Sequence, residues 1–554
     1  MPLLLQRAGE LMSPWDALKA QAAARPHAVF LRFPMAAELP FARGGGEFSY
    51  AEVFGLADLT RKRFAEAGYG RGACVALLLE NRQQFFWYWL ALNALGVSIM
   101  PINPDLRVDD LAYQLSVAEP DLVVALPETH ALIANAWGGK ALSGDDSRII
   151  SPVSPSIPSC RVRVTRQTAE RDDPCALLFT SGTTAQPKCC VLSNDYFLRI
   201  AAWYVTQGGA AAMGDSETVL TPLPMFHMNA LGCTVTGMLL TGGTVVPLDR
   251  FHARRWWRTV KESGATVIHY LGVMPAILLQ LEKEAAETAH SVRFGFGAGV
   301  DPRHQESFER RFGFQLIEAW AMTETGAGAV TSTAVGRRHV GQRCIGRAAR
   351  DMDWRIVDDA GADVARGTAG ELLVRQKGDA ARRGFFTEYL KDEAATREAW
   401  DGGWFHTGDV VSEGEDGALF FVDRKKNIVR RSGENIAVIE VEGVLANLDG
   451  IAGVAVAPVP DETRGEEVFA MIVPREAPHD ARAAAEQIAR ACAERLAYFK
   501  VPGHIAFVDN IPITPTQKLQ RGTIKALAAQ AVGAPGTIDL RAFKATLRQR
   551  EQSA

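Results

Sequence analysis

The feature of this sequence that most constrains its fold is an alternation of short apolar segments with longer helical patterns. After Phe48, a helical pattern over residues 50–67 leads to an apolar segment at 74–79 and then to a second helical pattern over 83–95. Short apolar segments that end at Gly, Pro or a helix are typical of strands buried in a sheet. Further segments of this kind lie at residues 97–102, 122–126, 175–180, 244–248, 266–270 and 293–297. The alternation predicts an α/β fold with a large sheet flanked by helices.

The pattern changes after about Gly346, where shorter strand-like segments alternate with turns. Beyond the charged stretch at 423–426 the α/β pattern returns. It comprises a helical pattern at 438–447, strand patterns at 454–458 and 468–473, and an Ala-rich helical pattern at 480–496. We therefore predict a second, smaller α/β domain. The expected division is residues 1–425, residues 426–535 and a short charged tail at 536–554, which follows a loose connection at 528–536.

Charge and hydrophobicity exclude several classes of protein. Sixty Lys and Arg against 64 Asp and Glu give a net charge of -4, so the chain as a whole does not attract nucleic acid or an anionic membrane. The most apolar window, residues 85–100, contains Asn93 and is shorter than the roughly 20 residues that span a bilayer. We interpret it as a buried helix and the strand after it, and we expect no integral membrane contact.

The cysteines and the N-terminus indicate a reducing compartment. The eight cysteines show no CxxC spacing and no paired histidine, which argues against a zinc ribbon or a redox dithiol. The first residues, MPLLLQRAGELMS, lack a basic leading region and a small-residue cleavage site, so they do not predict a secretory signal. We therefore expect a cytoplasmic protein.

The most informative motif is LLFTSGTTAQPK at residues 177–188, an apolar strand that continues into a hydroxyl-rich turn. Backbone amides and hydroxyls of such a turn can donate hydrogen bonds to phosphate oxygens, glycine allows close approach of the backbone, and lysine adds positive charge. The alternative interpretation is a polar surface turn, and the spacing is not that of a Walker loop. The predicted phosphate ligands are Thr180, Ser181, Gly182, Thr183, Thr184 and Lys188.

This loop resembles the phosphate loop of the ANL superfamily, which comprises acyl-CoA and aryl-CoA ligases, luciferases and adenylation domains and usually carries TSGTTGxPKG. The chain departs from that form at Ala185 and Cys189, and Asn194 stands where relatives usually carry His. Other motifs of the superfamily follow in its order. The resemblance spans about residues 48–525. It implies a large N-terminal domain of layered sheets and helices with a distorted β-barrel subdomain, plus a small mobile C-terminal α/β domain.

Three motifs resemble the parts of that superfamily that hold the acid, the adenine and the α-phosphate. PLPMFH ends at His227, which the resemblance places beside the acyl carboxylate. In FGFGAG, the resemblance assigns the adenine face to Gly297, Ala298 and Gly299. For His227 taken alone, the alternative is a satisfied interior histidine, and the glycine-rich motif taken alone is a weak signal.

WAMTE at residues 320–324 is similar to YGxTE, with Trp for Tyr and Ala321 for Gly. The resemblance assigns stacking on adenine to Trp320, the α-phosphate to Thr323 and magnesium to Glu324. Carboxylate and phosphate oxygens are the ligands that magnesium prefers.

Motifs in the last third of the chain resemble the ribose site, the hinge and the mobile domain. The resemblance assigns the ribose hydroxyls to Asp409 of GWFHTGD and to Arg424 of DRKK, and the pivot between domains to Lys426. A solvated charge run is the alternative for DRKK. PITPTQK resembles PxTxxGK, with Gln517 for Gly, and implies that Lys518 bridges carboxylate and α-phosphate during adenylation.

Together these motifs imply an ATP-dependent carboxylic acid–CoA ligase that forms an acyl adenylate with magnesium, releases pyrophosphate and then makes a thioester. The resemblance expects rotation of the small domain to bring a tunnel for the thiol arm, formed by Ser432, Gly433 and Glu434, to the same site. The expected partners are a small carboxylic acid, ATP and coenzyme A, with a homodimer as one oligomeric state. The segments FFTEY, FVDRKKNIVRRSGEN and FKVP look most like the crotonobetaine and carnitine CoA ligases, which does not by itself make carnitine the substrate.

Other activities remain open at this point. Relatives that adenylate amino acids usually place Asp directly after the aromatic residue at position 227, whereas this chain has Met228, which argues against an α-amino acid. A luciferase-like oxygenase or an enzyme that loads a carrier protein would share every adenylation motif. A non-catalytic relative would be expected to lose the ligands that this chain retains.

Overall fold

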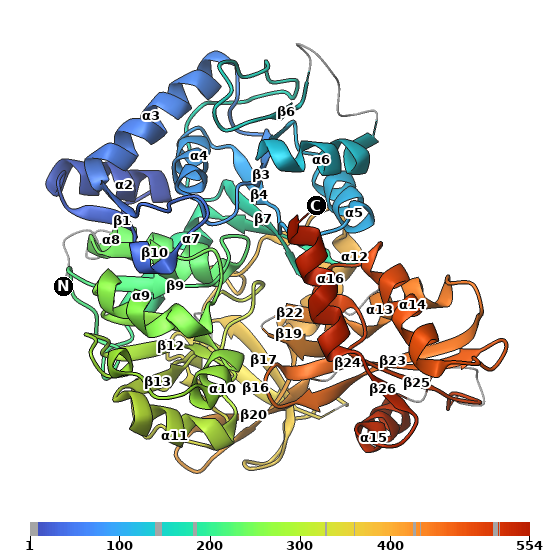
Figure 1. The fold of residues 1–554 in the computed structure, drawn as a ribbon. Coiled ribbons are helices and arrows are strands. Elements are labelled where there is room, and N and C mark those ends of the chain that lie inside the picture. Colours follow the sequence, from blue (N-terminus) through green and yellow to red (C-terminus); the bar gives the residue numbers. More distant parts are fainter. Residues whose placement is uncertain are drawn as a thin grey trace. The chain divides into compact units, whose positions relative to one another are not determined.

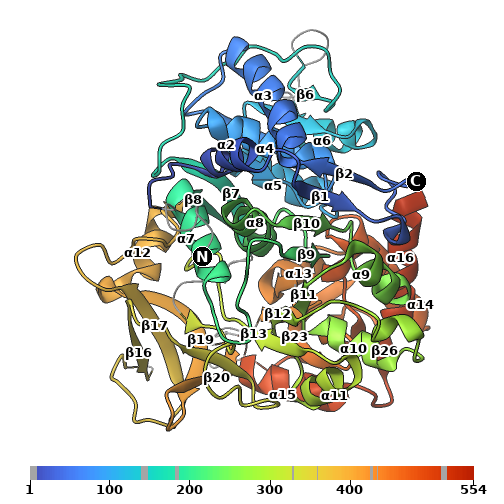
Figure 2. The ribbon, with the colours of Figure 1, turned by 90° about the vertical axis from the view of Figure 1, so that its left-hand side faces the viewer.

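The computed structural model describes residues 9–138, 147–180, 186–326, 330–358, 360–424, 428–432, 434–512, 519 and 521–553. The chain divides into two compact units. The larger contains Met1–Pro104, Leu115–Leu178 and Cys189–Asp423, and the smaller contains Asp105–Gln114, Phe179–Lys188 and Arg424–Ala554. The predicted α/β class is confirmed, because both units combine sheets with helices (Figures 1 and 2).

The first sheet of the larger unit has seven strands in the order β13-β12-β11-β9-β10-β1-β2, and all but β2 pair in parallel. The strands are β1 (Val29–Phe33), β2 (Gly46–Ser49), β9 (Thr218–Thr221), β10 (Thr244–Pro247), β11 (Val267–Leu271), β12 (Phe294–Ala298) and β13 (Gln315–Glu318). Ligands of such open parallel sheets bind at the carboxyl ends of the strands. The segments that follow β9, β11, β12 and β13 therefore meet at one edge.

The second sheet of the larger unit has the order β18-β8-β7-β4-β3-β5-β6. Its strands are β3 (Cys74–Leu78), β4 (Ser98–Pro101), β5 (Leu122–Ala125), β6 (Ile149–Ile150), β7 (Pro174–Thr180), β8 (Lys188–Ser193) and β18 (Glu388–Tyr389). Figure 1 shows α3 (Tyr50–Glu66) and α4 (Gln83–Ala94) beside it. Serine and glutamate side chains at Ser49 and Glu52 form a capping box that fixes the start of α3. Most of α4 is buried and β4 follows it, as the apolar window at 85–100 predicted.

A third sheet of the larger unit contains six strands in the order β14-β15-β20-β19-β17-β16, drawn together in gold in Figure 2. They are β14 (Val330–Thr331), β15 (Cys344–Ala348), β16 (Met352–Val357), β17 (Gly370–Gln376), β19 (Phe405–Glu413) and β20 (Ala418–Arg424). The pairs β14–β15, β15–β20, β16–β17 and β17–β19 are antiparallel. This six-stranded sheet stands where the distorted β-barrel subdomain was expected.

The smaller unit has a sheet in the order β22-β21-β24-β25-β26, with β23 paired to β24. Its strands are β21 (Ile428–Arg431), β22 (Glu434–Ala437), β23 (Ile451–Asp461), β24 (Gly465–Pro474), β25 (His504–Phe507) and β26 (Thr537–Asp539). Its long helices are α13 (Val438–Ala446), α14 (Ala481–Ala493), α15 (Arg521–Ala531) and α16 (Arg541–Ser553). The loose connection expected from residue 528 is wrong in part, since α15 continues to Ala531. The residues expected as a charged tail form β26 and α16, which bury Leu540 and Lys544.

Two further expectations can be compared with the described residues. None of the eight cysteines takes part in a disulfide bond. No helix in the described ranges is both long enough and apolar enough to cross a membrane.

Candidate functional site

Trp320 and Asp409 meet in the interior of the larger unit. The indole Nε1 of Trp320 donates a hydrogen bond to Asp409 Oδ2 at 2.9 Å, and the two residues are only 6% and 1% exposed. Trp320 follows the carboxyl end of β13, whereas Asp409 lies on β19. The pair therefore joins the adenine and ribose motifs of the sequence into one site.

A bulge in β19 places Asp409. The pairing of β19 with β17 shifts register between Glu371 and Leu373, and Gly408 has a φ of 66°. Glu371 accepts a hydrogen bond from the Gly408 amide at 3.1 Å, and the Thr407 hydroxyl accepts one from the Asp409 amide at 3.0 Å. Bulges of this kind re-aim a side chain, and glycine allows the left-handed backbone.

The glycine-rich strand β12 leaves no room for side chains where it ends. A Cβ on Gly297 would lie 2.1 Å from the Tyr270 carbonyl oxygen, and one on Gly272 would lie 1.7 Å from that of Gly299. Gly299 has a φ of 78°, and it is exposed like Ala298 beside it. The missing side chains of Gly297 and Gly272 therefore make room for neighbouring backbone, whereas a Cβ on Gly299 would meet nothing within 4 Å, so open space remains beside Gly299.

Glu318, at the end of β13, supports that turn and was not singled out from the sequence. It accepts hydrogen bonds from the amides of Gly299 at 2.9 Å and Val300 at 3.4 Å, and a short one from the Tyr270 hydroxyl. Burial raises the pKa of Glu318 to about 7, against the lowering effect of these hydrogen bonds. No sequence signal identified it, because its partners are backbone amides and a tyrosine on β11, two strands away in the sheet.

The turn after Trp320 holds Glu324 in a buried position. Glu324 Oε1 accepts a hydrogen bond from the Tyr389 hydroxyl at 2.9 Å, and its carbonyl oxygen accepts one from the Phe386 amide at 2.8 Å. Thr323, one residue earlier, is partly exposed. Tyr389 belongs to the FFTEY segment, which the sequence marked only for its likeness to a subfamily.

His227 follows β9 at the same carboxyl edge of the first sheet. It is partly buried, its ring lies 4.7 Å from that of Phe226, and burial lowers its pKa to about 4. The imidazole is therefore neutral at physiological pH and presents an uncharged surface. The π-helix η5 (Asn229–Thr236) begins two residues later, and such helices are frequent at functional sites.

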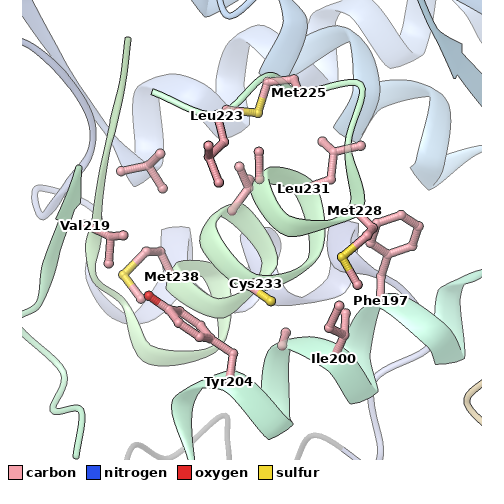
Figure 3. Packing of buried hydrophobic residues seen from close by; sticks show 14 of the residues in the cluster. Phe197, Ile200, Tyr204, Val219, Leu223, Met225, Met228, Leu231, Cys233 and Met238 are labelled. Atoms are coloured by element: carbon pink, nitrogen blue, oxygen red, sulfur yellow. The ribbon is translucent and has the colours of Figure 1, made fainter. Parts of the chain in front are cut away.

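The helix η5 packs on α7 (Asn194–Val205), as Figure 3 shows for Met228 and Cys233 against Ile200 and Tyr204. Behind this contact lies a buried polar group centred on His269 of β11. Its Nε2 lies 2.6 Å from the Tyr204 hydroxyl and its Nδ1 lies 2.7 Å from Asn229 Oδ1. Burial lowers the pKa of His269 to about 3. Sequence reasoning missed His269, since a lone histidine in a strand gives no signal.

The predicted phosphate loop is described only at its ends. Thr180 is the last residue of β7 and Lys188 the first residue of β8. Ser181, Gly182, Thr183 and Thr184 lie outside the described residues.

The residues predicted from the last motifs are described in part. Arg424 ends β20, and Ser432 lies in a turn after β21 with a φ of 51°. Burial raises the pKa of Glu434, the first residue of β22, to about 7, and the charge of Asp105 adds to the increase. Lys426, Gly433 and Lys518 lie outside the described residues.

The donor chemistry of the larger unit fits a magnesium ion that arrives with a nucleotide. Among the described residues no three His, Cys, Asp or Glu side chains gather as a metal site. Glu324 offers one carboxylate, so phosphate oxygens and water would complete the octahedral shell.

Comparisons with known proteins identify the family of the chain. Residues 18–385 match the AMP-binding enzyme family, and residues 440–518 match the C-terminal domain of AMP-binding enzymes. Crotonobetaine/carnitine–CoA ligase of Salmonella paratyphi A is 28% identical over 491 residues, which cover 86% of this chain and 93% of the relative. The protein of that name from Escherichia coli O157:H7 is 27% identical with the same coverage.

Solved structures share the fold. The o-succinylbenzoate CoA synthetase of Bacillus subtilis, a double mutant with a product analogue bound, has a TM-score of 0.77 at 21% identity and covers 93% of this chain and 98% of its own. A malonyl-CoA ligase with methylmalonyl-CoA and AMP bound has a TM-score of 0.71 at 26% identity, with coverage of 88% and 96%.

Proposed function

Because the chain belongs to the AMP-binding enzyme family, as its motifs predicted, we propose that it is an ATP-dependent carboxylic acid–CoA ligase. The observation that carries this function is the buried pair of Trp320 and Asp409, together with the turn at Gly299, where a Cβ would meet nothing within 4 Å. The pair provides an aromatic ring and a carboxylate for a ribose in one unit. The likeness to CoA ligases over most of the chain supports a thiol as the acceptor.

In the first step a carboxylate oxygen of the acid attacks the α-phosphorus of ATP, the bond to the β-phosphate breaks, and pyrophosphate leaves. Trp320 and Asp409 hold the nucleoside, while Thr323 donates to the α-phosphate. The neutral ring of His227 lies beside the acid. Glu324 would hold magnesium, which supplies charge neutralisation when bound.

The remaining motif residues complete this step. Thr180, Lys188 and the loop residues between them receive the leaving pyrophosphate, Arg424 reaches the ribose, and Lys518 bridges the reacting oxygens.

In the second step the sulfur of coenzyme A attacks the acyl carbonyl, the bond to AMP breaks, and the thiol proton leaves to solvent. We assign the passage of the thiol arm to Ser432, Gly433 and Glu434. Rotation of residues 426–535 about Lys426 would exchange Lys518 for this segment, so that one site performs both reactions.

The proposal extends to cellular setting and assembly. The eight cysteines, none of them in a disulfide bond, support a cytoplasmic enzyme, and light scattering on the purified protein tests whether it is a homodimer.

Pyrophosphate release with ATP and magnesium tests the function across short, branched, aromatic and quaternary-ammonium acids, with and without coenzyme A. One acid should release pyrophosphate and give AMP and an acyl-CoA of the expected mass. Asp409→Asn should abolish release, whereas Asp416→Asn, which removes an exposed carboxylate paired with Arg347, should not. Pyrophosphate release without thioester formation would mean that the acyl acceptor is a compound other than coenzyme A. No release with any acid would refute the function.

A further inference from the structure

Three charged side chains form a buried cluster in the smaller unit. Arg431 Nε donates to both carboxylate oxygens of Glu467, at 2.8 and 2.7 Å, and Lys544 Nζ donates to Glu467 Oε1 at 2.8 Å. The residues are 3%, 0% and 1% exposed. Lys544 also donates to the carbonyl oxygen of Phe499 at 3.0 Å. Charges this deeply buried persist only when their partners compensate them, so each member depends on the others.

The C-terminal residues are fixed against this cluster by backbone contacts. Strand β26 pairs with β25, with Ile538 opposite Ile505, and the Leu540 amide donates to the Gly503 carbonyl oxygen at 2.8 Å. A Cβ on Gly503 would lie 2.4 Å from Glu467 Cγ, so glycine is required where the carboxylate passes. Figure 1 shows α16, in red, against the same unit. Helix α16 therefore delivers Lys544 to one defined position.

Arg431 connects the cluster to the turn at Ser432. It is the last residue of β21 and pairs with Glu434 across the turn. Ser432 adopts a left-handed backbone with a φ of 51°, which a residue other than glycine keeps only when its surroundings impose it. Its amide donates to the Arg464 carbonyl oxygen at 3.0 Å, and Arg464 donates to its hydroxyl at 3.3 Å.

We propose that α16 is a positioning element for the thioester step. Lys544 holds the carboxylate of Glu467 in place, and both oxygens of that carboxylate accept hydrogen bonds from Arg431. Arg431 then fixes the turn at Ser432, which admits the thiol arm. The inference rests on the proposed function, which places that turn at the passage of coenzyme A. The adenylation step does not use this turn, so the two half-reactions separate the role of α16 from general stability.

Lys544→Met removes the buried cation and keeps a side chain of similar length. Acid-dependent exchange of pyrophosphate into ATP should stay within about twofold of the parent, while single-turnover transfer from preformed acyl adenylate to coenzyme A should slow about tenfold or more. Arg431→Lys, which keeps the charge and loses the two-bond contact, should show the same division. The double variant should be no slower than the slower single one, because both changes break one chain of contacts.

Leu547→Ala is the matched control, since it removes a buried side chain of the same helix that does not touch the ion cluster. It should lower the melting temperature and leave the ratio of the two half-reaction rates the same as in the parent. Equal losses in both half-reactions for Lys544→Met, or an unchanged transfer rate, would overturn the inference. If Lys544→Met does not fold, Arg431→Lys decides by the same comparison. Failure of the proposed function is distinct, because the parent itself would then form no thioester.

Discussion

Trp320 and Asp409, which are 89 positions apart, are joined by a hydrogen bond of 2.9 Å between the indole N–H and a carboxylate oxygen. The superfamily usually carries tyrosine at this position. Here the indole offers an aromatic face for a base and at the same time a donor that orients the carboxylate for a ribose. The proposed nucleotide site therefore depends on this contact between the segment after β13 and strand β19.

Removing the indole donor should weaken nucleotide binding more than it slows the chemical step. Trp320→Phe keeps a stacking face and loses the hydrogen bond to Asp409, so the KM for ATP should rise about tenfold with kcat within about twofold. Trp404→Phe, whose parent ring packs under Arg375, is the control and should leave the KM for ATP unchanged. Steady-state kinetics check this, and an unchanged KM in Trp320→Phe would contradict the assigned role.

Gly297 should tolerate no side chain. Gly297→Ala places a Cβ 2.1 Å from a backbone oxygen, so the strand must shift, at a cost of about 1–3 kcal/mol, and ATP binding should be lost with it. Gly55→Ala is the matched control, because its Cβ meets nothing within 4 Å inside α3 and alanine favours a helix. Thermal unfolding and ATP titration measure both effects, and equal melting temperatures for the two variants would contradict the packing argument.

The hydroxyl of Tyr389 should lower the magnesium concentration that the enzyme needs. Burial and then the charge of Glu324 raise the pKa of Tyr389, so the hydroxyl stays protonated and donates to that carboxylate. In Tyr389→Phe, the magnesium concentration for half-maximal pyrophosphate release should rise about three- to tenfold, since the carboxylate loses the bond that orients it. Tyr88→Phe, which loses only a bond to the Pro152 carbonyl oxygen, should titrate like the parent.

His269 should make the protein sensitive to acid. Its pKa in the folded state is about 3, below the roughly 6.5 of an unfolded histidine, so the unfolded chain binds the extra proton as pH falls. Stability is therefore retained above pH 6.5 and lost below it, with a slope of up to about 1.4 kcal/mol per pH unit from this residue.

His269→Gln should lower stability at pH 7, where it breaks the contacts to Tyr204 and Asn229, yet flatten the fall in melting temperature between pH 6.5 and 4.5. His27→Gln, at an exposed position, should follow the parent curve. Melting temperatures across this range make the comparison, and parallel curves for His269→Gln and the parent would exclude a neutral buried imidazole.

The helices and strands that local pattern predicted in the larger unit lie within a few residues of observed ones. The expected helix at 50–67 is α3 (Tyr50–Glu66), and the expected strand at 293–297 is β12 (Phe294–Ala298). Periodicity and capping depend on neighbouring residues, so they can be recognised in the sequence. The C-terminal residues were predicted less well, as a charged tail, because α16 has few apolar positions and its buried lysine has the sequence pattern of a surface charge.

The sequence by itself determined the family, the order of the motifs and the set of residues predicted to meet a nucleotide, because these follow from residue type and spacing. Only the tertiary structure decided which of them touch. The bonds from Tyr389 to Glu324, from the Gly299 amide to Glu318 and from Lys544 to Glu467 each cross between separate elements. Such contacts depend on strand order, register and bulges, which are set by the packing of the whole unit and leave no local trace.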